Sequence, residues 1–117
     1  MMMTLFQVAL GGAIGSVLRF LAVAGVGAPM GTFAVNVLGS FAMGVLFVAL
    51  PARMGLSPLL MTGVLGGFTT FSAFSLDALK LWQAGAVLPA AAYAGGSVIA
   101  SLIAVGFGAA LAKGVLA

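Results

Sequence analysis

The chain has 117 residues, of which 64% are hydrophobic and 4% are charged, and it contains no Cys and no His. Soluble domains carry about 25% charged residues, so this composition excludes a soluble globular protein and requires most of the outer surface to face lipid. The four scattered basic residues form no basic–aromatic cluster, which excludes nucleic-acid binding, and the lack of Cys and His excludes thiol chemistry and zinc sites.

Long uncharged runs define the predicted elements. Residues 20–52, 54–76 and 81–112 carry no charge, and each run exceeds the roughly 20 apolar residues that cross a bilayer. The runs do not alternate with period two, which argues against a β-barrel. We predict an all-α membrane protein with one domain, and we expect the apolar N-terminus to begin the first span instead of forming a cleaved signal peptide. The predicted transmembrane helices span residues 4–25, 32–50, 58–81 and 87–112.

The basic residues indicate no preferred orientation in the membrane. With four spans, Arg53 and Lys113 lie on one face, whereas Lys80 lies on the other and Arg19 lies nearer to that second face. The positive-inside rule requires a bias in Lys and Arg between the two faces. A chain without this bias can insert in both directions, which permits an antiparallel dimer. The alternative is a single orientation that is set by other factors.

The first span carries a glycine face and a cation. Gly11 and Gly15 are four residues apart, which predicts the close approach of another helix. Arg19 lies several residues inside the span. Its guanidinium either draws anions towards a vestibule or extends along the helix to the membrane interface, and the sequence leaves both functions open.

The second span has one polar face. Asn36, Ser40 and Gly44 recur every four residues and therefore lie on the same side of the helix. The Asn amide offers two N–H donors, which suit a dehydrated anion. The alternative is an ordinary hydrogen bond between helices, worth about 0.6–2 kcal/mol.

The third span is the most unusual, because glycine and hydroxyl residues fill its middle. The stretch 63–75 contains three Gly and a Thr-Thr-Phe-Ser sequence, and these residues hold an uninterrupted helix poorly. We predict a mid-membrane break that frees backbone carbonyls able to hold a cation. Phe71 and Phe74 share a face if the helix resumes. Their positive ring edges could then stabilise an anion, or the rings could simply pack or face lipid.

The fourth span carries a hydroxyl every four residues, at Tyr93, Ser97 and Ser101. This spacing forms one slowly drifting stripe along a helix. Such a stripe lines an ion track, or its Ser hydroxyls bond back to the preceding turn, and the sequence leaves both possibilities open.

Three motifs together resemble the Fluc family of fluoride channels, also called CrcB. They are Gly-Gly-x-x-Gly-x-x-x-Arg-Phe from Gly11, Gly-Thr-x-x-Val-Asn-x-x-Gly-Ser-Phe from Gly31, and Gly-Gly-Phe-Thr-Thr-Phe-Ser-x-Phe-Ser from Gly66. The resemblance runs from about Gly11 to Ser101, which is most of the chain, and the third motif is highly specific.

The resemblance implies an antiparallel, dual-topology homodimer in the inner (plasma) membrane, with two separate fluoride pores. It also implies a structural Na⁺ at the dimer centre, held by the backbone carbonyls of Gly66 and Thr69 where the third helices break and cross. Arg19 matches the family's vestibule cation. The residues that match the family's pore are Asn36, Phe71, Phe74, Tyr93, Ser97 and Ser101.

Two positions depart from the family's usual residues. Ala73 stands where the family often has Thr, and Asp77 stands where it often has Glu. The missing hydroxyl at position 73 is expected to weaken one contact along the pore. The Asp side chain is one methylene shorter than Glu, which affects any gating or hydrogen-bonding role of the carboxylate.

The hypothesis that follows is passive, electrogenic export of cytoplasmic fluoride, without an enzymatic reaction. Arg19 would raise the anion concentration at the pore mouth. Asn36 would then donate hydrogen bonds together with Ser and Thr hydroxyls, including those of Thr70 and Ser72. The aromatic edges would hold the ion loosely enough for its release.

Three alternatives belong to other classes. A small dual-topology multidrug exporter needs a membrane-embedded acid, typically in the first span, and the only acid here is Asp77 in the third. A non-conducting membrane assembly protein leaves the polar stripes of three spans unexplained. An intramembrane enzyme is poorly supported, because the chain lacks His and Cys.

Overall fold

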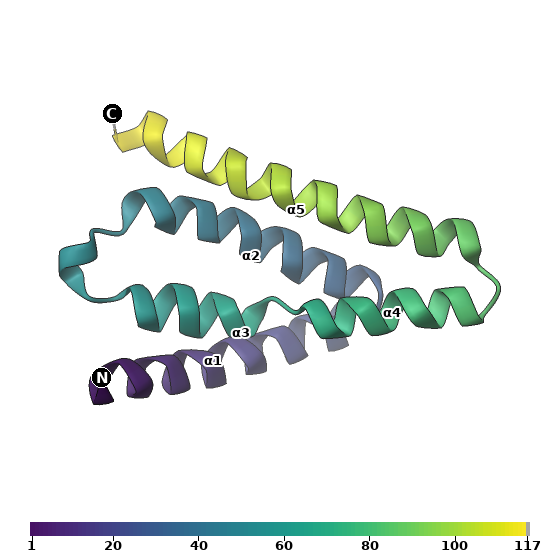
Figure 1. Ribbon diagram of the computed structural model, residues 1–117, viewed down its shortest axis with the longest axis horizontal. Coiled ribbons are helices and arrows are strands. Elements are labelled where there is room, and N and C mark those ends of the chain that lie inside the picture. Colours follow the sequence, from purple (N-terminus) through teal and green to yellow (C-terminus); the bar gives the residue numbers. More distant parts are fainter. Residues whose placement is uncertain (117) are drawn as a thin grey trace.

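The computed structural model describes residues 1–116, and all regular structure within them is helical (Figure 1). Four helices are long and apolar enough to cross a membrane. They are α1 (Met2–Val26), α2 (Met30–Ala49), the segmented third span (Pro58–Gln83) and α5 (Val87–Leu116). The prediction of an all-α membrane protein with four spanning helices is confirmed.

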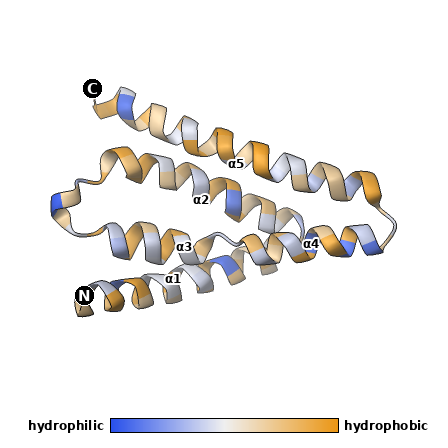
Figure 2. Ribbon diagram, viewed as in Figure 1, coloured by the Kyte–Doolittle hydropathy of each residue, from blue (hydrophilic) through white to orange (hydrophobic). Residues whose placement is uncertain are grey.

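The outer surface has the character that lipid requires. Figure 2 shows mostly hydrophobic and neutral residues along every helix, with a few hydrophilic residues near the ends of the molecule and on α1 and α2. Large side chains point outwards, including Phe20, Phe47 and Leu88, which are 70%, 72% and 81% exposed. Because no water is available in hydrocarbon, helices are the form in which such segments satisfy their own backbone groups.

The third span is not one helix. It consists of a π-helix, an α-helical turn and a longer α-helix, and a short 3₁₀-helix precedes it. These elements are η1 (Ala52–Met54), η2 (Pro58–Leu65), α3 (Gly66–Phe68) and α4 (Phe71–Gln83). Thr69 and Thr70 separate α3 from α4 and are extended, with ψ angles of 156° and 121°. The helical path is therefore interrupted within the glycine- and hydroxyl-rich stretch, whereas the sequence did not indicate the π-helix.

The helices pack in a definite pattern (Figure 1). α2 lies along α5, α1 lies along η2 and α3, and α4 packs against the N-terminal half of α5. The N-terminus, η1 and the end of α5 lie at one end of the molecule, and the turn between α4 and α5 lies at the other. Arg53 in η1 and Lys113 in the last turn of α5 are thus at the end opposite to Lys80 in the last turn of α4.

Glycines bring the backbones of neighbouring helices into contact. A Cβ atom on Gly11 or Gly15 of α1 would clash with the carbonyl oxygen of Leu59 or Val64. Gly44 of α2 meets the backbone of α5 in the same way. The close approach predicted from the spacing of Gly11 and Gly15 is confirmed, and the neighbouring helix is η2.

Substitution of Gly15 with Ala should destabilise the fold. The added Cβ would lie 2.8 Å from the backbone nitrogen of Phe68, and overpacking of this kind costs about 1–3 kcal/mol. Thermal unfolding of the detergent-solubilised protein should show a lower midpoint for Gly15→Ala. Gly12→Ala is the matched control, because nothing lies within 4 Å of a Cβ at that position. Equal midpoints for both variants would contradict the packing argument.

Candidate functional site

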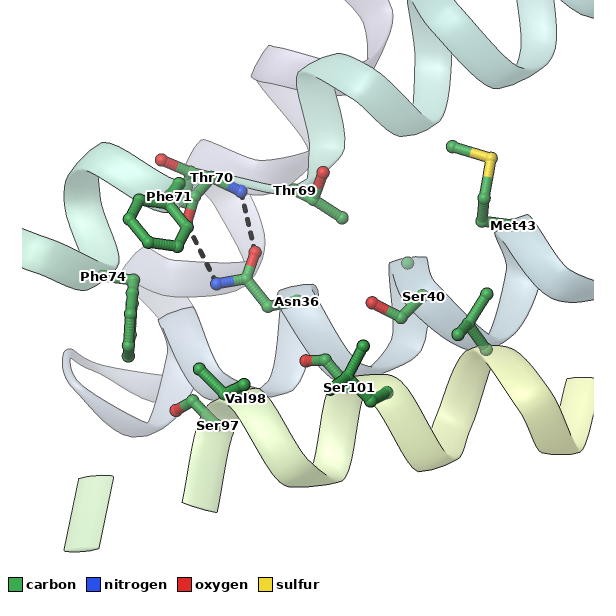
Figure 3. Close-up of a pocket in the computed structure, with 13 residues that line it drawn as sticks. Asn36, Ser40, Met43, Thr69, Thr70, Phe71, Phe74, Ser97, Val98 and Ser101 are labelled. Atoms are coloured by element: carbon green, nitrogen blue, oxygen red, sulfur yellow. Dashed lines mark hydrogen bonds between the residues drawn. The ribbon is translucent and has the colours of Figure 1, made fainter. Parts of the chain in front are cut away.

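A side chain from α2 bridges the interruption of the third span. Asn36 Nδ2 donates to the Thr70 carbonyl oxygen at 3.0 Å, and the Thr70 backbone N–H donates to Asn36 Oδ1 at 2.7 Å (Figure 3). These two bonds satisfy the backbone polar groups of Thr70 outside a helix. An Asn amide has two N–H donors, so one remains for a ligand. The sequence left open whether Asn36 bonds to another helix or donates to an anion. Asn36 makes hydrogen bonds to the third span, and its remaining N–H can still contact an anion.

Arg19 of α1 contacts the same break from another side. Its Nε–H donates to the Gly67 carbonyl oxygen at 2.9 Å, and the side chain is half-buried. The positive charge thus lies at the C-terminal end of the helical run formed by η2 and α3, where the helix dipole favours it. Arg carries five N–H donors, so most of them remain free for water or an anion. A cavity of about 230 Å³ beside it is lined by Arg19, Phe20, Val23, Ala24, Thr32, Thr70 and Ala73.

The break leaves several carbonyl groups without their helical partners, and those of Gly66 and Thr69 are among them. In a continuous helix, the N–H groups of Thr70 and Ala73 would bond to the carbonyl oxygens of Gly66 and Thr69. Here the Thr70 N–H donates to Asn36, and the Ala73 N–H donates to the Thr70 side-chain oxygen at 3.2 Å. The freed oxygens of Gly66 and Thr69 are the two that the resemblance assigned to Na⁺. Backbone carbonyl oxygens of unwound helices are suitable ligands for that ion.

A groove of about 400 Å³ runs between α2, the break and α5 (Figure 3). Six of the predicted pore and hydroxyl residues line it, together with apolar side chains and Ser40. The lining residues are Asn36, Gly39, Ser40, Met43, Thr69, Thr70, Phe71, Phe74, Ser97, Val98, Ser101, Leu102 and Val105. The structure therefore brings together residues from three of the four spans, which is the arrangement that an ion path between helices requires.

Ser97 is the most informative residue of this groove. Its side chain is 4% exposed, and within residues 1–116 its Oγ is a buried polar atom with no hydrogen-bond partner. Buried hydroxyls in proteins nearly always have a partner. A hydroxyl that is held in a groove without one can donate to water or to an anion that occupies the groove.

The two phenylalanines after the break form an edge-to-face pair. The ring centroids of Phe71 and Phe74 are 5.4 Å apart with an interplanar angle of 69°. Phe74 is buried and also packs on Tyr93 at 5.3 Å, whereas Phe71 is 76% exposed. The rings share a face of α4, as their spacing predicted, and both line the groove.

Tyr93 and Ser72 do not line the groove. The Tyr93 hydroxyl donates to Asp77 Oδ2 at 3.2 Å, and both residues are buried. A buried carboxylate requires a donor, and this contact directs the phenol of Tyr93 away from the stripe that continues through Ser97 and Ser101. Ser72 is exposed, and its Oγ lies 3.5 Å from the Thr70 hydroxyl.

Sequence reasoning did not assign several groove residues to the site. Ser40 could have been found, because it lies one turn after Asn36 on the same face. The apolar lining residues carry no signal, because apolar side chains fill every span of this chain. These residues are Met43, Val98, Leu102 and Val105.

Comparisons with known proteins decide the family. The family model described as "CrcB-like protein, Camphor Resistance (CrcB)" matches residues 6–109. The chain belongs to the CrcB-like family. This result confirms the family resemblance inferred from the three motifs, and it supports a multi-pass location in the plasma membrane.

Curated relatives of this CrcB-like protein match it almost from end to end. A protein of Paracoccus denitrificans is 48% identical and covers 97% of this chain and 98% of its own length. A Ruegeria protein is 51% identical, with 99% of each chain covered. A Cereibacter sphaeroides protein is 50% identical over the full length of both chains. Each of these relatives is named "Fluoride-specific ion channel FluC".

Replacement of Asn36 with Ala should loosen the break. The variant loses both hydrogen bonds to Thr70 and leaves partly buried backbone groups unpaired, at a cost of up to about 1–3 kcal/mol for each group. The thermal unfolding midpoint of the detergent-solubilised protein should fall. Leu38→Ala is the control on the same helix, because Leu38 is 61% exposed. An Asn36→Ala midpoint no lower than that of Leu38→Ala would contradict a role of Asn36 in holding the break.

Proposed function

We propose that this chain is a fluoride-specific ion channel. The observation that carries the proposal is the match to relatives of that name, about half identical over nearly the whole of both chains. The groove between α2 and α5 supports it independently, because it combines hydrogen-bond donors with aromatic edges and an otherwise apolar lining. A chain of this kind conducts an ion and is not an enzyme.

Fluoride is small and strongly hydrated, so it must exchange water for other donors as it crosses. The unpartnered Ser97 hydroxyl, the Ser101 hydroxyl and the remaining N–H of Asn36 supply these donors within the groove. The edges of Phe71 and Phe74 offer weaker contacts. A series of moderate contacts lets an ion enter without being trapped, which conduction requires.

A second copy in antiparallel orientation would complete each pore, which gives two pores per dimer. Phe71 and Gly66 are exposed in the single chain, so both are accessible to a partner copy. The split of basic residues between the two ends removes the usual preference for one orientation. Thr69 and Thr70 stand near the middle of the 26-residue third span, which favours a break at mid-membrane depth.

A structural Na⁺ fits the break. The carbonyl oxygens of Gly66 and Thr69 have lost their helical partners, and oxygen ligands of this kind suit Na⁺. The residue pair from each copy would hold the ion where the two breaks cross. The ion would supply fixed positive charge at the centre of the dimer.

Transport is proposed to be passive and to follow the electrochemical gradient of fluoride out of the cytoplasm. Arg19 would raise the local anion concentration beside the cavity that it lines, because a fixed cation next to low-dielectric walls concentrates anions.

The decisive test is fluoride efflux from liposomes that contain the purified protein, with a potassium ionophore to balance charge and chloride as the comparison ion. We expect rapid electrogenic loss of fluoride and little loss of chloride. Folded protein without fluoride efflux would refute the proposal. Proton-coupled cation export that depends on Asp77 would then be the next activity to measure.

Phe71→Ile should strongly reduce fluoride efflux while the protein remains folded. The substitution removes a ring edge whose contacts are worth about 0.5–1.5 kcal/mol, which corresponds to roughly a 2- to 13-fold change in rate. Phe47→Ile is the matched control, because Phe47 is similarly exposed at 72% and does not line the groove. Undiminished efflux in Phe71→Ile would rule out the aromatic contact.

Removal of Na⁺ should lower stability. A ligand that binds only the folded state stabilises it by about 2.7 kcal/mol at a hundred times its dissociation constant. The thermal unfolding midpoint should therefore be higher in sodium chloride than in N-methyl-D-glucamine chloride at equal ionic strength. The same midpoint in both salts would argue against a structural Na⁺.

A further inference from the structure

The side chain of Thr69, the first residue of the break, has a defined orientation. Its Oγ1–H donates to the Leu65 carbonyl oxygen at 3.0 Å, and its backbone N–H donates to the same oxygen at 3.1 Å. A β-branched residue has few side-chain rotamers, so this bond fixes the direction of the methyl group. The methyl carbon, Cγ2, is directed at α2.

Gly39 of α2 receives that methyl group. Gly39 is buried, and a Cβ built on it would clash with Thr69 Cγ2 and lie 3.3 Å from Phe68 Cδ2. Gly39 follows Asn36 by three residues, which is nearly one helical turn, so both residues face the break. α2 thus contacts the break at two adjacent points, through the Asn36 amide at Thr70 and through the space at Gly39 for Thr69.

Gly39 differs from the glycines that pack helix against helix. Gly11, Gly15 and Gly44 each meet backbone carbonyl groups, so they determine how closely two helices approach. The three atoms nearest to a Cβ on Gly39 all belong to the side chains of Phe68 and Thr69. The space left by the absent side chain of Gly39 therefore determines the position of the break relative to α2.

We propose that Gly39 is a positioning residue for the ion path. The space that it leaves holds the Thr69 methyl group. Together with the Asn36 hydrogen bonds, this contact orients the Thr69 carbonyl and the start of α4 for their proposed roles at the Na⁺ site and in the groove. This inference rests on the proposed channel function. It adds a residue that has no side chain to bind an ion but that determines the geometry of the residues that bind one.

The contact with Thr69 Cγ2 makes a compensation experiment possible. Gly39→Ala should reduce fluoride efflux about tenfold, equal to about 1.4 kcal/mol in the barrier, and should raise the Na⁺ concentration needed for half-maximal efflux. Thr69→Ser keeps the hydroxyl bonded to Leu65 and removes only the methyl, so the efflux of this single variant is the reference for the double variant. The double variant Gly39→Ala/Thr69→Ser should recover most of the lost efflux and restore the Na⁺ dependence.

Gly106→Ala controls for the general effect of replacing a helical glycine, because nothing lies within 4 Å of a Cβ there. Efflux is divided by the amount of folded protein measured by size-exclusion chromatography. If Gly39→Ala does not fold, the folded yield of Gly39→Ala/Thr69→Ser replaces efflux as the readout. This yield should recover, because the methyl that clashes with the added Cβ is absent.

The outcomes separate the two proposals. Absence of efflux in the wild type would refute the channel function itself. Wild-type efflux with normal conduction in folded Gly39→Ala would overturn only the role of Gly39. Loss in Gly39→Ala that Thr69→Ser does not relieve would also overturn it, because the methyl contact would then not be the cause. If Gly39→Ala does not fold, an equally low folded yield of the double variant would have the same meaning.

Discussion

Backbone groups without partners are costly in a setting that water does not reach, and the extended residues Thr69 and Thr70 create several of them. Asn36 pairs both backbone groups of Thr70, and Arg19 donates to the carbonyl of Gly67. Side chains from α1 and α2 therefore converge on one short segment of the third span. The groove and the aromatic pair depend on this arrangement, because Thr69 and Thr70 line the groove and the aromatic pair follows them directly in α4.

Close packing is what allows those side chains to reach the break. Gly15 brings α1 against the third span, and Gly39 of α2 makes room for Thr69 of the break. If these helices stood farther apart, Arg19 and Asn36 could not form hydrogen bonds of 2.7–3.0 Å to backbone groups. The glycines of this chain thus act indirectly on the site, by determining the distance over which polar side chains have to reach.

Polar residues inside the spans serve two purposes. Asn36 and Arg19 satisfy backbone groups of the break and still keep unused N–H donors, so a structural contact does not prevent a contact with an anion. Tyr93 instead satisfies Asp77. Ser97 has no protein partner among the described residues, and this is the property expected of a group reserved for a transported ion.

Composition and span length determined the class of this protein, because an uncharged apolar run of sufficient length has few stable alternatives to a membrane helix. The motifs were sufficient to indicate the family, and the propensities of Gly and Thr indicated where the third helix is weak. Tertiary structure decided which function each polar residue performs. Asn36 forms hydrogen bonds with Thr70, which is 34 residues away in the sequence, and the Tyr93 hydroxyl donates to Asp77, which is 16 residues away. Periodicity places a residue on a face of its own helix, but only the packing of separate helices determines which groups that face meets.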